Sequence, residues 1–219
     1  MTNINTLLSK LYKKPLYIVG EELGYKKSNI LILENKFDRL KNEFPEVWQQ
    51  IISCTHNKDQ RSFEDYSKDL VSSWILEDTL LYYLKKYGLD IKLNGTDGER
   101  DILANLKIRT DSDYLIKFKD KERPAELITS YTNYWNFNKK IDLRDNKYLG
   151  LKKTNSLLIC VDLFNKNFFI LDFQQNTYNI KLIPFHKPYN KAAYQISLEN
   201  FKPIKLTITN LLRELKKQF

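Results

Sequence analysis

The sequence predicts an α+β fold, with a central mixed β-sheet flanked by helices and preceded by a small helical module. Residues 63–87 place leucine and tryptophan at three- and four-residue steps, which is typical of an amphipathic helix. Residues 114–131 and 156–183 hold short apolar or alternating segments divided by polar turns, which is typical of strands. Residues 55–61 are polar and predict a linker. We therefore expect a helical module over residues 1–60 and one larger domain over residues 61–219.

The composition excludes several classes of protein. With 219 residues and 42% hydrophobic residues, the chain is long enough and apolar enough to bury a core. Residues 1–10 lack a signal-peptide core and no apolar run approaches a membrane span, so a cytoplasmic protein without a membrane partner is expected. Cys54 and Cys160 form neither a metal-ligand spacing nor a disulfide framework. The six glycines form no dinucleotide fingerprint, so no organic cofactor is expected.

The net charge of +9 is concentrated in the second half of the chain. Residues 111–219 hold nineteen Lys and Arg against eleven Asp and Glu, whereas residues 1–60 carry +2 and residues 61–110 carry −1. A basic field attracts polyanions and accelerates their encounter with the protein. The charge therefore favours nucleic-acid binding, and the alternative is a soluble basic protein whose lysines are simply solvated.

Residues 15–42 match the spacing of a helix-turn-helix. We expect one helix over residues 16–23, a turn over residues 24–27, and a second helix from Ser28 to about residue 41, with Gly20 allowing a close crossing and Gly24 the turn. The second helix of such a motif enters the major groove with its first residues, here Lys27, Ser28 and Asn29. The alternative is a pair of helices joined by a glycine turn, with no role in DNA binding. A third short helix is expected over residues 47–54.

The long helix over residues 63–87 should end at Gly88 as its C′ residue. Glu77 lies in the middle of this helix, either on a solvated face or pointing to a metal site as a third ligand. A strand is expected over residues 89–93, followed by a polar loop over residues 94–101. That loop either forms a surface turn or presents Arg100 to a substrate phosphate. Residues 102–108 are apolar and fit a strand or a short helix.

Two acids stand on a predicted β-hairpin. Strands are expected over residues 114–118 and 125–131, with a polar turn over residues 119–124. Asp113 precedes the first strand and Glu126 lies inside the second. Carboxylates on paired strands can converge on a hard cation such as Mg²⁺, which prefers oxygen ligands. The alternative is two ordinary strand acids, but an acid inside an apolar strand is costly unless it is paired or bound to metal.

An aromatic and basic tract follows the hairpin and supplies candidate DNA contacts, namely Tyr131, Tyr134, Lys139, Lys140 and Arg144. After a break at residues 136–138 we expect a basic helix over residues 141–153. Strands over residues 156–162, 168–173, 178–183 and 193–198 follow, with a loop over residues 184–191 and a final amphipathic helix over residues 209–217. His56 and His186 fall on predicted loops without an evident partner, which argues against nucleases and triad hydrolases that depend on histidine.

Helix, strand, acid-bearing hairpin, basic helix and strand together resemble the PD-(D/E)XK nuclease superfamily, and type II restriction endonucleases in particular, over roughly residues 65–185. The resemblance assigns Ser112-Asp113 to the first half of the motif and Glu126-Leu127-Ile128 to the second. It implies that Asp113 and Glu126 bind Mg²⁺ and activate water. Ile128 occupies the position of the motif lysine, so the resemblance requires a displaced one.

Lys147 is the first candidate for the displaced lysine, and Lys139 or Lys140 is the second choice. Arg144 is expected to contact the scissile phosphate through two hydrogen bonds. Together these expectations describe a Mg²⁺-dependent endonuclease acting on double-stranded DNA in a restriction-modification system, as a homodimer if it cuts both strands of a palindrome. Two alternatives stay open: a non-catalytic helix-turn-helix regulator in which residues 65–219 serve an effector or dimerisation role, and a repair or recombination nuclease of the same fold.

Overall fold

The computed structural model describes residues 41–42, 45, 63–94, 112–175 and 178–219. The chain divides into two compact units, residues 1–83 with 96–109 and residues 84–95 with 110–219. The predicted linker at residues 55–61, the third helix over 47–54, the segment over 102–108 and nearly all of the predicted helix-turn-helix lie outside the described residues. These expectations, and the boundary at residue 60, therefore stay predictions.

Helix α5 (Phe63–Lys86) confirms the predicted long helix, and it passes from the first unit into the second between Tyr83 and Leu84. Its C-terminus is a Schellman motif. The Gly88 N–H donates to the carbonyl of Lys85 and the Leu89 N–H to that of Leu84, each at 2.9 Å. Gly88 has φ +85°, a conformation that favours glycine, so its predicted role as the C′ residue is confirmed.

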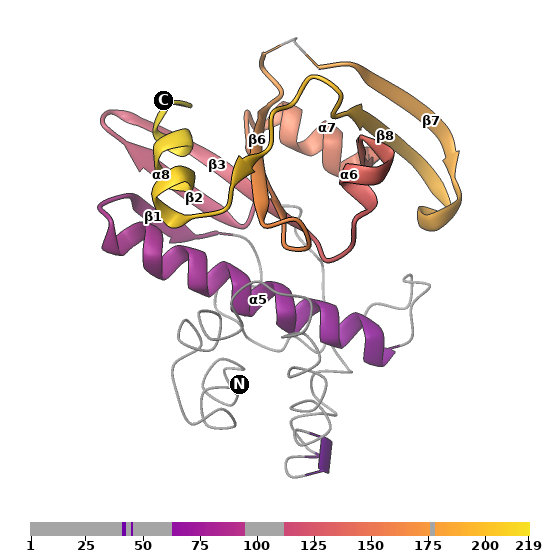
Figure 1. The fold of residues 1–219 in the computed structure, drawn as a ribbon, viewed down its shortest axis with the longest axis horizontal. Helices are drawn as coiled ribbons and strands as arrows, with labels where there is room; N and C mark the ends of the chain where they lie inside the picture. Colours follow the sequence, from indigo (N-terminus) through magenta and orange to yellow (C-terminus); the bar gives the residue numbers. More distant parts are fainter. Residues whose placement is uncertain (1–40, 43–44, 46–62, 95–111, 176–177) are drawn as a thin grey trace. The chain divides into compact units, whose positions relative to one another are not determined.

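The second unit is built on a six-stranded sheet with the order β1-β2-β3-β5-β6-β9 (Figure 1). The strands are β1 (Asp90–Leu93), β2 (Tyr114–Phe118), β3 (Lys121–Ser130), β5 (Leu157–Asp162), β6 (Asn167–Asp172) and β9 (Ile204–Lys205). Strands β3 and β5 run parallel, whereas every other neighbouring pair is antiparallel. The sheet is therefore mixed, and the predicted α+β class is confirmed. All six residues of β5 are buried, as expected of a central strand.

The predicted turn over residues 119–124 is too long. Phe118 pairs with Lys121, so the turn consists of two residues, and Lys119 adopts φ +56° in it. Pro124 lies inside β3 opposite Leu115, although it was expected in the turn. Its missing N–H is tolerated because β3 pairs with β5 only from Ala125 onward, so at Pro124 the strand is still an edge.

A second, three-stranded sheet has the order β4-β8-β7 and consists of β4 (Lys140–Arg144), β8 (Lys191–Ser197) and β7 (Ile180–His186). The expectation of one helix over residues 141–153 is wrong for its first part, because residues 140–144 form β4 and only α7 (Asp145–Lys153) is helical. Ile141 and Leu143 are buried on one face of β4 and alternate with less buried neighbours. That two-residue period is the signal of a strand, and it outweighs the helical propensity of the basic residues.

Two further expectations need correction. The break at residues 136–138 lies within a short helix, α6 (Tyr134–Asn138), which ends at Lys139 in the left-handed conformation. The loop expected over residues 184–191 is mostly regular secondary structure, because β7 continues to His186 and the 3-10 helix η1 (Lys187–Tyr189) leads to β8. Pro184 is accommodated because β7 is the edge strand and its register shifts between Ile183 and His186. The C-terminal helix is confirmed as α8 (Ile208–Lys216), capped by Thr207.

One hydrophobic cluster joins the two sheets and α7. It contains Tyr148 and Leu151 of α7, Leu158 and Cys160 of β5, and further residues of α6, β4, β6 and β8 with their neighbours, namely Trp135, Ile141, Leu143, Phe169, Leu171, Phe173, Ile196 and Leu198. Helix α7 is thereby fixed against the face of the large sheet that carries Leu158 and Cys160. None of the helices in the described ranges is long and apolar enough to cross a membrane.

Candidate active site

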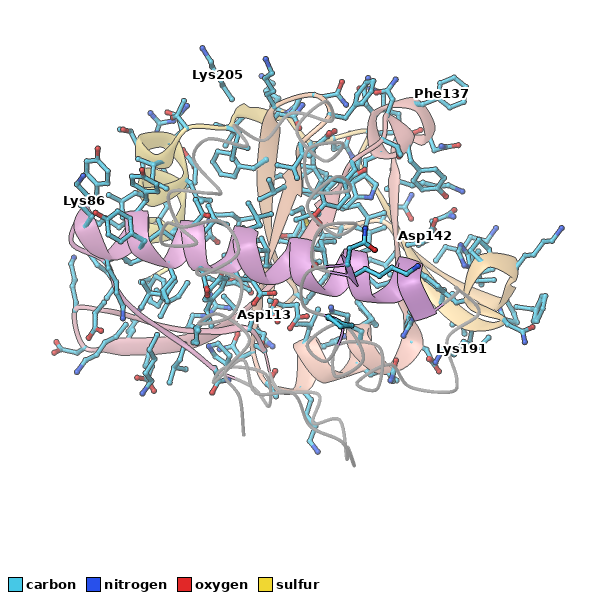
Figure 2. All side chains as sticks on the ribbon, turned by 90° about the horizontal axis from the view of Figure 1, so that it is seen from below. Lys86, Asp113, Phe137, Asp142, Lys191 and Lys205 are labelled. Atoms are coloured by element: carbon cyan, nitrogen blue, oxygen red, sulfur yellow. The ribbon has the colours of Figure 1, made fainter. Side chains whose placement is uncertain are left out.

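Of the two predicted acids, Asp113 directly precedes β2 and Glu126 lies in β3, the neighbouring strand of the large sheet. Tyr114 pairs with Ala125, so Asp113 and Glu126 follow at the same level of β2 and β3. The Leu127 N–H donates to Asp113 Oδ2 at 2.7 Å, which holds that carboxylate against β3 beside Glu126. The Asn94 N–H donates to the Asp113 carbonyl at 2.8 Å and fixes its backbone to the end of β1. Figure 2 labels Asp113 in this part of the second unit.

The third group at this place is Lys147 of α7, whose ammonium forms an ion pair with Glu126 Oε1. Lys147 lies one helical turn before the buried Leu151, so its side chain leaves the helix on the side that packs on the sheet. Burial of the amine lowers its pKa, but the negative charges of Glu126 and Asp113 outweigh that effect. The pKa of Lys147 is therefore raised, and the side chain is an ammonium ion at neutral pH. The Glu126 side chain is 11% exposed and that of Lys147 is 36% exposed.

The Lys147 ammonium lies close enough to the large sheet to act on Glu126 of β3 and on a buried thiol of β5. Ile128 pairs with Cys160 across the parallel β3–β5 ladder and packs against the hydrophobic cluster. Burial raises the pKa of the Cys160 thiol, and the positive charge of Lys147 partly opposes that rise. The same ammonium thus acts electrostatically on the thiol beside Ile128 and on both acids. The amine paired with Glu126 thus comes from α7, and position 128 of β3 carries isoleucine.

A chain of three hydroxyl groups connects the segment before Asp113 to the C-terminus of α7. Ser112 Oγ lies 2.9 Å from Ser156 Oγ, which lies 2.6 Å from Thr154 Oγ1. Ser112 is 6% exposed and Ser156 is 1% exposed, so the bond between them is sheltered from water, whereas Thr154 is exposed. Ser112 is therefore part of a hydrogen-bonded connection between two segments. It ties the backbone of Asp113 to the helix that carries Lys147.

The predicted DNA contacts of the aromatic and basic tract fall in several environments. Arg144 lies close enough to Lys147 for its positive charge to lower the pKa of Lys147, and its guanidinium lies 5.4 Å from the Tyr189 ring centre. Tyr134 donates to Asp142 Oδ2 at 2.6 Å, and the Lys140 amine lies 6.0 Å from the Tyr134 ring. The Lys139 amine donates to Asn136. Tyr131 follows β3 directly and is half-buried.

Of the three lysines considered for the displaced role, Lys147 is the one that pairs with Glu126. Glu77 is buried in α5 and belongs to the first unit, so its proposed part as a third ligand stays a prediction. The remaining candidates, Lys27, Ser28, Asn29 and Arg100, lie outside the described residues.

The expectation that His186 stands on a loop without a partner is wrong. His186 ends β7, and its Nε2 lies 3.4 Å from Asp142 Oδ2 on β4. Burial raises the pKa of Asp142, but hydrogen bonds from Tyr134 and Gln195 and the positive charges nearby together lower it by more. The pKa of Asp142 is therefore below its usual value. Sequence reasoning missed this polar cluster because its members come from strands that are distant in the chain.

The donor set at the site fits a magnesium ion. Mg²⁺ is usually held by one or two carboxylates together with waters and substrate phosphate oxygens, and Asp113 and Glu126 supply two adjacent carboxylates. A carboxylate has two oxygens, so Glu126 can pair with Lys147 through Oε1 and still offer Oε2 to a cation. Within the described ranges, no group of three or more His, Cys, Asp or Glu side chains comes close enough together to hold a metal. Comparison of the chain with models of known protein families and with curated proteins gives no match.

Proposed function

We propose that this protein is a Mg²⁺-dependent endonuclease that hydrolyses phosphodiester bonds of double-stranded DNA, related to the PD-(D/E)XK superfamily. The observation that carries the proposal is the meeting of Asp113, Glu126 and Lys147 at one point. Two acids and one amine, presented by a β-hairpin and the following helix, are the side chains that such hydrolysis requires. The +8 charge of residues 111–219 supports a polyanionic substrate.

The proposed mechanism assigns a role to each side chain. Asp113 and Glu126 would hold the cation through carboxylate oxygens. When bound, Mg²⁺ lowers the pKa of a water molecule and neutralises charge that develops on phosphate oxygens. Arg144, which lies near Lys147, would hold a non-bridging oxygen pair of the phosphate through its guanidinium.

The charge of Lys147 decides what its amine can do. Because the neighbouring acids raise its pKa, the side chain stays protonated near neutral pH. An ammonium ion donates hydrogen bonds and cannot take a proton. As an ammonium ion, Lys147 would orient the attacking water and stabilise the negative charge of the transition state.

The setting follows from the same proposal. A type II restriction enzyme acts in the cytoplasm on foreign DNA, and cutting both strands of a palindromic site calls for a symmetric homodimer. The described residues give no separate support to the alternative of a regulator that binds DNA without cutting it. Light scattering combined with size-exclusion chromatography measures the oligomeric state directly.

The decisive experiment incubates the protein with plasmid and phage DNA in Mg²⁺ or in EDTA. We expect cleavage in Mg²⁺ alone, and a loss of at least about 100-fold in rate for Glu126→Gln and for Asp113→Asn, since each removes a charged oxygen ligand. Glu122→Gln is the matched control, because Glu122 lies on the same strand and is exposed. DNA binding without cleavage on every substrate, with Glu126→Gln behaving as the unaltered chain, would support the regulator and refute the nuclease.

A further inference from the structure

The connection between β7 and β8 is a basic projection, where a loop over residues 184–191 was expected from the sequence. The β4–β8 pairing ends with Arg144 opposite Ala193, whereas β7 and β8 continue to the pair His186–Lys191. Beyond the last pair of β4 lie the ends of β7 and β8, which pair at His186 and Lys191, and the 3-10 helix η1 that joins them; we call residues 184–192 the β7–β8 tip. Figure 1 shows β7 as the outermost strand of this sheet.

The charge and exposure of the β7–β8 tip suit an anionic partner. Residues 178–198 carry Lys181, Lys187 and Lys191 and contain no Asp or Glu. All three lysines are exposed, and Phe185 is 63% exposed between them. The nearby acid, Asp142, accepts hydrogen bonds from Tyr134 and Gln195 and lies 3.4 Å from His186 Nε2, so both of its carboxylate oxygens are engaged within the fold.

The β7–β8 tip is continuous with the candidate active site. Tyr189, in the short helix at the tip, donates to the Asp142 carbonyl at 2.9 Å and lies under the Arg144 guanidinium. The charges of Arg144 and Lys147 both lower the pKa of Tyr189, although burial raises it overall. Tyr189 therefore connects the β7–β8 tip to Arg144 of the candidate active site.

We propose that the β7–β8 tip binds the phosphate backbone of the DNA duplex beside the scissile bond, with its two strands facing the major groove. The proposal rests on the proposed nuclease function and names the part of the chain that positions its substrate. A two-stranded ribbon fits the major groove of B-form DNA, which is about 12 Å wide. The deep, narrow major groove of A-form RNA does not admit it. The exposed Phe185 would contact sugars or thymine methyl groups between the lysine contacts.

The test compares two double variants that each remove two exposed positive charges. Lys187→Ala/Lys191→Ala alters the tip, and Lys202→Ala/Lys205→Ala is the matched control on and near β9. Figure 2 shows Lys191 and Lys205 at separate margins of the second unit. Fluorescence anisotropy with a labelled 30-base-pair duplex in EDTA, over a range of salt concentrations, measures binding without cleavage.

Each phosphate contact contributes about 0.9 to the slope of log K against log salt. Losing two contacts should therefore lower the slope by about 1.8 in the tip variant, which corresponds to about 60-fold weaker binding at 0.1 M salt. The control should change the slope by less than about 0.5. Duplex RNA of the same sequence should bind with little dependence on the tip.

Equal slopes for the tip variant and the control would overturn the inference, and so would RNA binding that depends on the tip as strongly as DNA binding does. Cleavage assays on the same proteins separate this result from the fate of the nuclease proposal. Cleavage by the unaltered chain without a tip effect on binding leaves the nuclease standing and removes the inference. DNA binding that depends on the tip, by a chain that never cleaves DNA, would support the inference about the tip and refute the nuclease proposal.

Discussion

Moving the amine from α7 back to β3 tests whether Lys147 replaces the missing motif lysine. Lys147→Met keeps the length of the side chain and removes the charge, so it deletes one hydrogen-bond donor and one positive charge at the acids. Loss of a single stabilising donor of this kind costs about 100- to 1,000-fold in rate. We then expect Ile128→Lys, added to Lys147→Met, to restore at least about tenfold of the lost activity.

The geometry of β3 supports this recovery. Residues 126 and 128 lie on the same face of the strand, about 6.6 Å apart, since each residue rises about 3.3 Å. A lysine at position 128 would keep its aliphatic stem against the hydrophobic cluster, where Ile128 now packs, and extend its amine toward Glu126. It would also return a partner to Glu126, whose side chain is only 11% exposed.

The same substitutions have a measurable effect on folding. Lys147→Met leaves a nearly buried carboxylate without its cation, which costs on the order of 1–3 kcal/mol of unfolding free energy. Urea unfolding should show this loss, and the double variant should recover part of it. Ile128→Met in place of Ile128→Lys is the control, because it lengthens the side chain without adding an amine.

The assay pairs the cleavage rate in Mg²⁺ with the urea midpoint for each variant. A double variant that folds as stably as Lys147→Met and yet cleaves no faster would refute the idea of a relocated amine. Full activity in Lys147→Met alone would refute any role for this side chain in the reaction.

Three further predictions concern stability. Arg123 donates to both carboxylate oxygens of Asp172 at 2.9 Å, and the two side chains are 11% and 9% exposed. Asp172→Asn should therefore lower the unfolding free energy by about 3 kcal/mol, whereas Lys217→Ala, which removes an exposed partner of Glu214, should cost less than about 1 kcal/mol. Equal losses for the two variants would contradict this. Hydrogen bonds from Arg123 hold the pKa of Asp172 below its usual value despite the opposing effect of burial. The contribution of Asp172 to the unfolding free energy is therefore complete above the unfolded pKa near 3.9 and disappears as the pH falls through the folded pKa. An acid-unfolding curve that is the same with and without Asp172→Asn would contradict that assignment. Gly88→Ala should cost about 1–2 kcal/mol in urea unfolding because of the φ of +85° at that position, and an unchanged midpoint would show that the helix end rearranges freely.

The elements with a clear local pattern were predictable from the sequence. The alternation in residues 114–118 predicts β2 with its observed bounds, and the apolar run after Ser156 predicts β5. Glu126 stands out in the sequence because an acid inside an apolar strand is costly unless it is paired or bound to metal, and Asp113 because it precedes the partner strand of the same predicted hairpin. Their placement on paired strands follows from the hairpin alone, so no long-range information was needed.

The elements that depend on long-range pairing were not predictable in the same way. Residues 140–144 carry three charged side chains and resemble a continuation of α7, yet they form a strand because β8 pairs with them some fifty positions later. The same pairing brings His186 to Asp142 and extends β7 through a segment expected to be a loop. The propensity of a short segment does not depend on which distant strand will pair with it, so such elements are decided by tertiary contacts.

The position of the lysine shows which parts of such a site are fixed and which are free. Carboxylates that share a cation must converge within hydrogen-bonding distance of one point, and adjacent β-strands fix that separation through their backbone ladder. An ammonium acts over a longer range and stands at the end of a flexible stem, so several backbone positions can deliver it. On the proposed mechanism the chain must then hold constant the distance from helix to hairpin, and the hydrogen-bonded hydroxyl groups of Ser112, Ser156 and Thr154 connect these two parts. Position 128 would then not need to carry a lysine, and Ile128 packs there against the hydrophobic cluster.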